Sequence, residues 1–127
     1  MRKRARAWGV AVESTLETPS SLVAFGARGR LPVVLKVVRR PGDEWHCGRV
    51  LRAFAGRGMV DALEAVDGAV LMERLAPGTP LVTMTLDGRD DEATDVLADV
   101  MRRMSRPGPP PPGTPTAERW GRAFDWY

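Results

Sequence analysis

The run Leu31-Pro32-Val33-Val34-Leu35-Lys36-Val37-Val38 decides how the fold of this chain is interpreted. Its β-branched and apolar residues predict a buried strand, yet Lys36 lies inside it. The sequence uses arginine for nearly every other positive charge, and its only other lysine is Lys3. A compact ammonium can contact phosphate oxygens and a carboxylate together, whereas the planar fork of arginine fits such a space differently. We therefore expect a chemical role for Lys36; the alternative is an edge-strand lysine that extends its charge into water.

The residues before this run form two further strand-like segments. The first covers Trp8–Leu16 and the second Ser21–Gly26. Turn residues separate the three segments, first at positions 17–20 and then at positions 27–30. β-rich runs bounded by Pro, Gly and Ser predict an antiparallel meander.

A helix and two more strands are expected after the run. Pro41 and Gly42 end the sheet, and Asp43 is placed to cap a helix that continues to about Ala55. Strand-like segments then cover Met59–Val66 and Ala69–Leu75. The order predicts an α+β fold: a five-stranded antiparallel sheet with one helix inserted after the third strand, followed by one or two helices.

The C-terminal part of the chain has a different composition. A helix is predicted over Asp90–Met104, with Arg89-Asp90-Asp91 as its cap, and Glu118–Tyr127 resembles the opening of another helix. Six prolines between them indicate an extended linker. The expected divisions are a basic, disordered start at 1–7, a lobe at 8–75, a connector and helix at 76–105, the linker at 106–115 and a truncated helix at 116–127.

Composition limits the possible functions. The net charge of +3 comes largely from the first six residues, which gives little support for nucleic-acid binding. No apolar run approaches a membrane span and no signal peptide is apparent, so we expect a soluble, cytoplasmic protein. A single cysteine, Cys47, excludes an internal disulfide. Its neighbour His46 is the only histidine, so we expect helix packing there and no metal site.

Four segments in this order carry a resemblance to a known family: Ser20–Val23, Val33–Lys36, Leu51–Val60 and Ala69–Leu75. The third contains a Gly-Arg-Gly after the expected helix, and the fourth contains Leu-Met-Glu-Arg-Leu. The chain resembles the N-terminal lobe of the aminoglycoside phosphotransferases, most closely the streptomycin 6-kinase type, also called aminoglycoside/hydroxyurea antibiotic resistance kinases. This resemblance implies a protein-kinase-like small lobe. The full-length family uses ATP with magnesium, and we expect weak binding or none for this chain.

The resemblance also implies site residues. Lys36 would neutralise the α- and β-phosphates, and Glu44 would hold it through an ion pair, unless Glu44 is a first-turn helix residue. Ser20 and Ser21 could donate to phosphate oxygens or form an ordinary β-turn. The backbone of Glu73 and Leu75 would face the adenine edge. Val34, Met72 and Leu22 would line the apolar slot around the base.

The groups that transfer phosphate in this family are missing from the sequence. Such kinases need an aspartate base in a His-Gly-Asp-type loop and an Asn for magnesium, and the chain contains no Asn. No catalytic residue is therefore assigned. We expect a small lobe that is inactive alone. It would bind an aminoglycoside only if a C-terminal lobe is supplied. The alternatives are a non-catalytic interaction module docking through its aromatic C-terminus, and an unrelated small α+β domain. Exposed apolar surface also predicts self-association.

Overall fold

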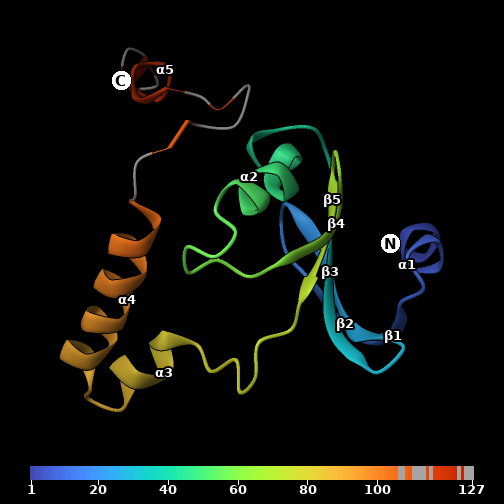
Figure 1. Cartoon of the computed structure of the whole chain (residues 1–127), viewed down its shortest axis with the longest axis horizontal. Coiled ribbons are helices and arrows are strands. Elements are labelled where there is room, and N and C mark those ends of the chain that lie inside the picture. The colour runs from blue at the N-terminus through green and yellow to red at the C-terminus, as the bar shows by residue number, and fades with distance from the viewer. Residues whose placement is uncertain (106–107, 110–113, 115, 123, 125–127) are drawn as a thin grey trace.

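The computed structural model describes residues 1–105, 108–109, 114, 116–122 and 124. Its centre is a five-stranded antiparallel sheet with the order β1-β2-β3-β5-β4, which confirms the predicted fold class (Figure 1). The strands are shorter or shifted by a few residues relative to the prediction: β1 Ala11–Glu17, β2 Ser21–Arg28, β3 Leu31–Val38, β4 Ala62–Val66 and β5 Ala69–Glu73.

Strand β3 lies in the middle of the sheet, and its alternating side chains separate two faces. Val33 and Leu35 are fully buried on one face together with Leu71 of β5. Lys36 and Val34 point to the opposite face, because successive side chains of a strand alternate. The apolar run thus places most of its residues in the core while directing the lysine to the other side.

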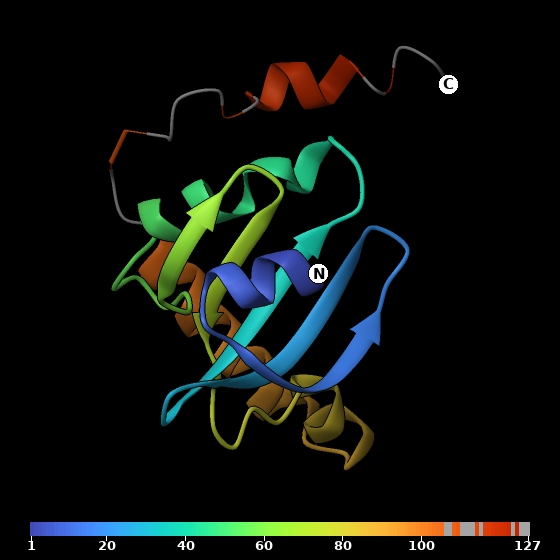
Figure 2. The ribbon, with the colours of Figure 1, turned by 90° about the vertical axis from the view of Figure 1, so that its right-hand side faces the viewer.

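A short helix, α1 (Arg2–Ala7), covers the Leu35 face, and Figure 2 shows it lying across the strands. The prediction of a disordered start was wrong. Ala5 is buried in the same cluster as Leu35, and the guanidinium of Arg4 lies 5.0 Å from the ring centre of Trp8. Burial of this small face stabilises six residues that would not form a helix in isolation.

The opposite face is covered by the 3₁₀-helix η1 (Asp43–His46) and the helix α2 (Cys47–Ala53). The single helix expected here is therefore divided, and Gly42 occupies the N-cap position while the Asp43 side chain makes no capping bond. Helix α2 approaches the sheet closely at Gly48, where a Cβ atom would lie 2.5 Å from the Cβ of Ala65. This close packing fixes the helix that follows Glu44.

The turn between β4 and β5 anchors η1 to the end of β3. Gly68 has a φ of +76°, and the ring of Trp45 packs where its side chain would be. The Gly68 N–H donates to the Trp45 carbonyl at 2.7 Å, and the Gly68 carbonyl accepts from the Val38 N–H at 2.8 Å. The three elements consequently meet at one end of the sheet, beside Glu44.

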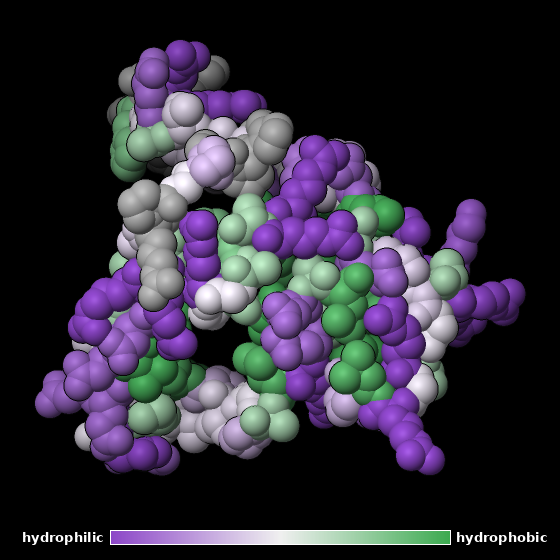
Figure 3. Space-filling model, viewed as in Figure 1, coloured by the Kyte–Doolittle hydropathy of each residue, from purple (hydrophilic) through white to green (hydrophobic). Residues whose placement is uncertain are grey.

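Two helices follow the sheet. Helix α3 (Leu81–Leu86) was not predicted, whereas helix α4 (Asp90–Met104) has the bounds that were predicted. Arg89 rather than Asp90 occupies the N-cap position, and Asp90 accepts a hydrogen bond from the Thr85 hydroxyl at 3.1 Å. Figure 3 shows hydrophobic side chains over the middle of the molecule, with an opening between them and the α3–α4 pair. No helix among the described residues is long and apolar enough to cross a bilayer.

The last helix, α5 (Ala117–Gly121), begins where a helix was expected and is shorter than the predicted segment. Thr116 caps it, since its hydroxyl accepts from the Arg119 N–H at 3.2 Å. Most of the proline-rich stretch at 106–115, and the end of the predicted helix, lie outside the described residues.

Candidate functional site

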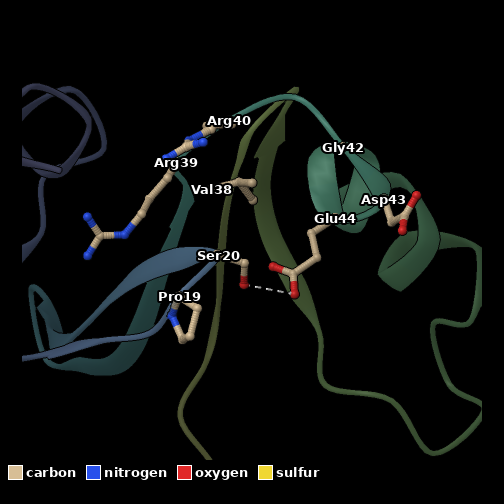
Figure 4. Close-up of a pocket in the computed structure, with 8 residues that line it drawn as sticks. All are labelled: Pro19, Ser20, Val38, Arg39, Arg40, Gly42, Asp43 and Glu44. Carbon is tan, nitrogen blue, oxygen red and sulfur yellow. Dashed lines mark hydrogen bonds between the residues drawn. The ribbon is translucent and has the colours of Figure 1, made fainter.

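The structure brings Lys36 of β3 into contact with Glu44 of η1. The Lys36 ammonium lies 2.9 Å from Glu44 Oε2. The Ser20 hydroxyl donates to Glu44 Oε1 at 3.2 Å, as Figure 4 shows. The lysine side chain is 25% exposed and the glutamate side chain 42%. The ammonium is therefore held in place by a carboxylate while part of it remains open to a ligand.

The electrostatics of this pair favour its charged form. The hydrogen bond from Lys36 lowers the pKa of Glu44, although burial of the carboxylate opposes the shift. The Ser20 hydroxyl adds a smaller effect in the same direction. Glu44 Oε2 is closed off from solvent, so the ammonium of Lys36 is the counter-charge that compensates for its burial.

The two serines of the β1–β2 turn are placed differently. Ser21 is buried, its N–H donates to Thr18 Oγ1 at 2.9 Å, and its hydroxyl lies 2.9 Å from the same oxygen. These contacts show that Ser21 stabilises the turn. Ser20 is exposed and directs its hydroxyl toward Glu44, so it is the serine of the turn that faces the Lys36–Glu44 pair (Figure 4).

An open hollow of about 490 Å³ lies beside Ser20 and Glu44 (Figure 4). Arg39 lines it but is already engaged, because its guanidinium contacts Glu17 at 2.8 Å and the Thr18 carbonyl at 3.2 Å. The hollow thus mixes cationic and acidic groups around the turn. The described residues that line it are Pro19, Ser20, Val38, Arg39, Arg40, Gly42, Asp43 and Glu44.

Apolar side chains continue from Lys36 along the same face of the sheet. Val34 is two residues from Lys36 on β3 and pairs with Met72 of β5, so both share the face of the lysine. On the other side of Lys36, Val23 of β2 is its direct cross-strand partner. Leu16 of β1 pairs in turn with Val23 and is 54% exposed. These residues form an open apolar row beside the ammonium.

The prediction that Leu22 lines this row was wrong. Leu22 pairs with Val37, and both therefore lie on the face covered by α1. Val23 and Leu16 occupy the place that was assigned to Leu22, and sequence reasoning missed them. Counting alternate positions back from Lys36 across the hairpin would have identified Val23.

Hydrogen bonds hold the end of β5 and the residue that follows it. The Glu73 N–H donates to the Asp61 carbonyl at 3.1 Å, and Glu73 Oε1 accepts from the Asp61 N–H at 2.8 Å. The Arg74 N–H donates to the Pro32 carbonyl at 3.2 Å. Leu75 is exposed, and its N–H donates to no group in the part of the chain that the structure describes.

His46 and Cys47 lie in the two helices that cover this face, shortly after Glu44. His46 Nδ1 lies 3.0 Å from Asp67 Oδ1, which also accepts from Arg49 at 2.8 Å. Burial raises the pKa of the Cys47 thiol, which disfavours the thiolate that binds metals or acts as a nucleophile. Within the described ranges no group of three His, Cys, Asp or Glu residues could hold a metal ion.

A five-stranded antiparallel sheet, with a third-strand lysine paired to a carboxylate on the following helix, defines the small lobe of kinase-like phosphotransferases. Comparison with known proteins identifies the family. Residues 8–126 match the family described as aminoglycoside/hydroxyurea antibiotic resistance kinase, and the chain belongs to this family.

One similar protein is a streptomycin 3''-kinase from Klebsiella pneumoniae, which is 37% identical over 105 residues. The match covers 81% of this chain and 39% of that protein, so the chain spans about two fifths of the length of its relative. No solved structure gives a significant match.

Acid is expected to weaken the contacts around η1. Hydrogen bonding to Lys36 lowers the pKa of Glu44 from 4.5, and the bond from His46, followed by the charge of Arg49, lowers the pKa of Asp67 from 3.8. Each of these carboxylates has a lower pKa in the folded protein than in the unfolded chain. The stabilisation of the fold by the two carboxylates is therefore complete above about pH 4.5, and it is lost as the pH falls through their folded-state pKa values. Thermal unfolding followed between about pH 6 and pH 3 should therefore show a falling midpoint.

The matched variants for this titration are Glu44→Gln and Asp67→Asn, which remove one titrating group each. Each variant should lose less stability than the unchanged chain over the acid range. An unchanged slope in both variants would contradict the assignment of the acid sensitivity to these two carboxylates.

Proposed function

We propose that this chain is the nucleotide-binding lobe of an aminoglycoside kinase and that it holds ATP on the sheet face covered by α2. The observation that carries the proposal is the Lys36–Glu44 ion pair at 2.9 Å, with the Ser20 hydroxyl beside it. In the whole enzyme the γ-phosphate of ATP would be transferred to a hydroxyl of a streptomycin-type antibiotic, which a second lobe would bind. Membership of the kinase family and the similarity to a streptomycin 3''-kinase support this substrate class.

Each part of the nucleotide has a counterpart on this face. The ammonium of Lys36 would neutralise the α- and β-phosphates, and Glu44 would hold the ammonium in position. Ser20 would add a hydroxyl donor at the β1–β2 turn. The apolar row (Leu16, Val23, Val34 and Met72) would contact the adenine ring, while the Leu75 N–H and the Glu73 carbonyl would bond its edge.

Magnesium accompanies ATP in this reaction class and helps to neutralise the phosphates. Protein sites for magnesium use carboxylate or amide oxygens. The described residues do not gather such a group, and the chain contains no Asn, so we assign no magnesium ligand to it.

Calorimetric titration of the purified chain with ATP and magnesium tests the proposal. We expect weak, saturable binding of one nucleotide per chain, because the lysine and the apolar row lie on one face of the sheet. The matched ligand is streptomycin alone, which we expect not to bind because its site is assigned to a second lobe. A folded chain that releases no binding heat with ATP would overturn the proposal.

Phosphoryl transfer is expected to be absent from these 127 residues by themselves. The reaction needs an aspartate base and metal ligands, whereas the only histidine, His46, contacts Asp67 and no His-Gly-Asp loop is present. Mass spectrometry of streptomycin incubated with the chain, ATP and magnesium should detect no added phosphate. ATP-dependent formation of phosphorylated streptomycin would contradict this prediction.

The second candidate function is a non-catalytic module that docks on a partner, or on another copy of itself, through its aromatic C-terminal segment. Trp120 and Phe124 favour it, because these side chains are 54% and 80% exposed. A folded chain that binds no ATP but self-associates in sedimentation experiments would favour this candidate.

A further inference from the structure

Arg74 connects the segment after β5 with strands β1 and β2. Its guanidinium donates to Glu13 Oε2 of β1 at 3.3 Å and lies 5.4 Å from the centre of the Phe25 ring of β2. Its backbone N–H donates to the Pro32 carbonyl at 3.2 Å. One residue therefore contacts β1, β2 and β3 through three different kinds of interaction.

These contacts lie on the face of the apolar row. Phe25 pairs with Val34, and Val34 pairs with Met72, so the three side chains follow one another across the sheet on the Lys36 face. The guanidinium over Phe25 therefore lies level with Val34, two residues along β3 from Lys36. Four residues along β3 separate Lys36 from Pro32, a distance of about 13 Å in a strand.

Glu13 reaches Arg74 because β1 is irregular at this point. The register of β1 against β2 shifts between Val12 and Ser14, which leaves Glu13 as the additional residue of a bulge. A bulge bends the strand and redirects its side chains. The ion pair with Arg74 connects residues that are 61 positions apart in the sequence.

Strand β1 is held by a further side-chain ion pair, between Glu17 at its end and Arg39 at 2.8 Å. It is an edge strand, all of its residues are exposed, and it pairs only with β2. Leu16 of the apolar row belongs to this strand. The position of Leu16 over the row therefore depends on how firmly β1 is attached to the rest of the sheet.

We propose that Arg74 is a positioning residue that holds β1 and β2 over the base-binding end of the nucleotide site. The inference rests on the proposed function. Through Glu13 and Phe25, Arg74 holds β1 and β2 beside Val34 and Met72, which would contact a purine base. Its effect falls on the base, because Val34 and Met72 lie one alternate position along the strands from Lys36, where the phosphates would lie.

Calorimetric titrations with adenosine and with inorganic tripolyphosphate test this division. Arg74→Ala should weaken adenosine binding about three- to tenfold, since it removes one exposed ion pair and one cation–π contact. Tripolyphosphate binding should remain unchanged. Arg74→Lys keeps the charge but not the planar group over Phe25, and should recover part of the affinity for adenosine. Glu13→Gln should weaken adenosine binding less than Arg74→Ala does.

Arg28→Ala is the matched control, because it removes an arginine that bonds a glutamate of another strand, Glu64, at 3.0 Å without touching the row. Equal adenosine affinity in Arg74→Ala and the unchanged chain would overturn the inference while leaving the proposed function in place. An equal loss for adenosine and tripolyphosphate would also overturn it. Absence of all binding to the unchanged chain would overturn the proposed function, and the inference with it.

Discussion

Replacing Lys36 by alanine is expected to weaken ATP binding about 10- to 100-fold, since a hydrogen bond to a charged group contributes roughly 1.5–3 kcal/mol. The change removes the ammonium that would contact the phosphates. It also leaves Glu44 Oε2, which is closed off from solvent, without its counter-charge. The unpaired carboxylate would then repel the phosphates. Both effects act in the same direction, so this variant should show the largest loss of affinity among the single substitutions on this face.

Calorimetric titration with ATP and magnesium measures this loss. Arg28→Ala is the control, because its ion pair with Glu64 has a comparable length of 3.0 Å and comparable exposure. It should retain the affinity of the unchanged chain. Lys36→Arg should restore little, because the guanidinium is wider than an ammonium and cannot occupy the same position beside Glu44. An affinity within twofold of the unchanged chain for Lys36→Ala would contradict the assigned role.

Replacing Gly26 by alanine is expected to reduce the free energy of unfolding by about 2–4 kcal/mol, since the added carbon overpacks a rigid part of the structure. Its Cβ would lie 2.0 Å from the Ala11 carbonyl oxygen and 3.1 Å from the Val12 Cα. Both neighbours are backbone atoms of β1 and cannot rotate away. Strand β1 would have to separate from β2, and Leu16 would move with it.

Urea unfolding followed by circular dichroism measures the effect of this variant. The control is Gly42→Ala, since a Cβ at Gly42 meets nothing within 4 Å and its φ of 171° is an extended conformation that alanine adopts. Its stability should remain within about 0.5 kcal/mol of the unchanged chain. A similarly small change for Gly26→Ala would show that β1 can move without cost, against the expectation from the structure.

Much of the sheet could be predicted because its strands carry local signals. The apolar run around Lys36, the Asp67-Gly68 turn and the Pro41-Gly42 break each act over a few residues. Helix α1 lacked such a signal, because Ala5 is the residue that it buries and the burial depends on the distant core. Helix α3 spans six residues, too few to reveal a helical period.

The site was predictable only where it depends on residue type. Lys36 could be named because a charge inside an apolar strand needs a partner, whereas Glu44 was named from the resemblance to the kinase family. Leu22 was assigned to the wrong face because the face of a side chain depends on the register between strands, which a one-residue shift reverses. The bulge at Glu13, which allows the contact with Arg74, likewise depends on the pairing of two strands.

The most direct test of the nucleotide site is its location, measured by backbone amide shifts in nuclear magnetic resonance spectra of the unchanged chain as ATP and magnesium are added. We predict the largest shifts at Leu75, Val23 and Val34, with a shift of the Leu75 amide that indicates a new hydrogen bond, and small shifts at Ala5 and the α1 face. Adenosine should reproduce the shift at Leu75, and tripolyphosphate should not. Saturating shifts confined to other surfaces, or no shifts in a folded chain, would contradict a nucleotide site beside Lys36.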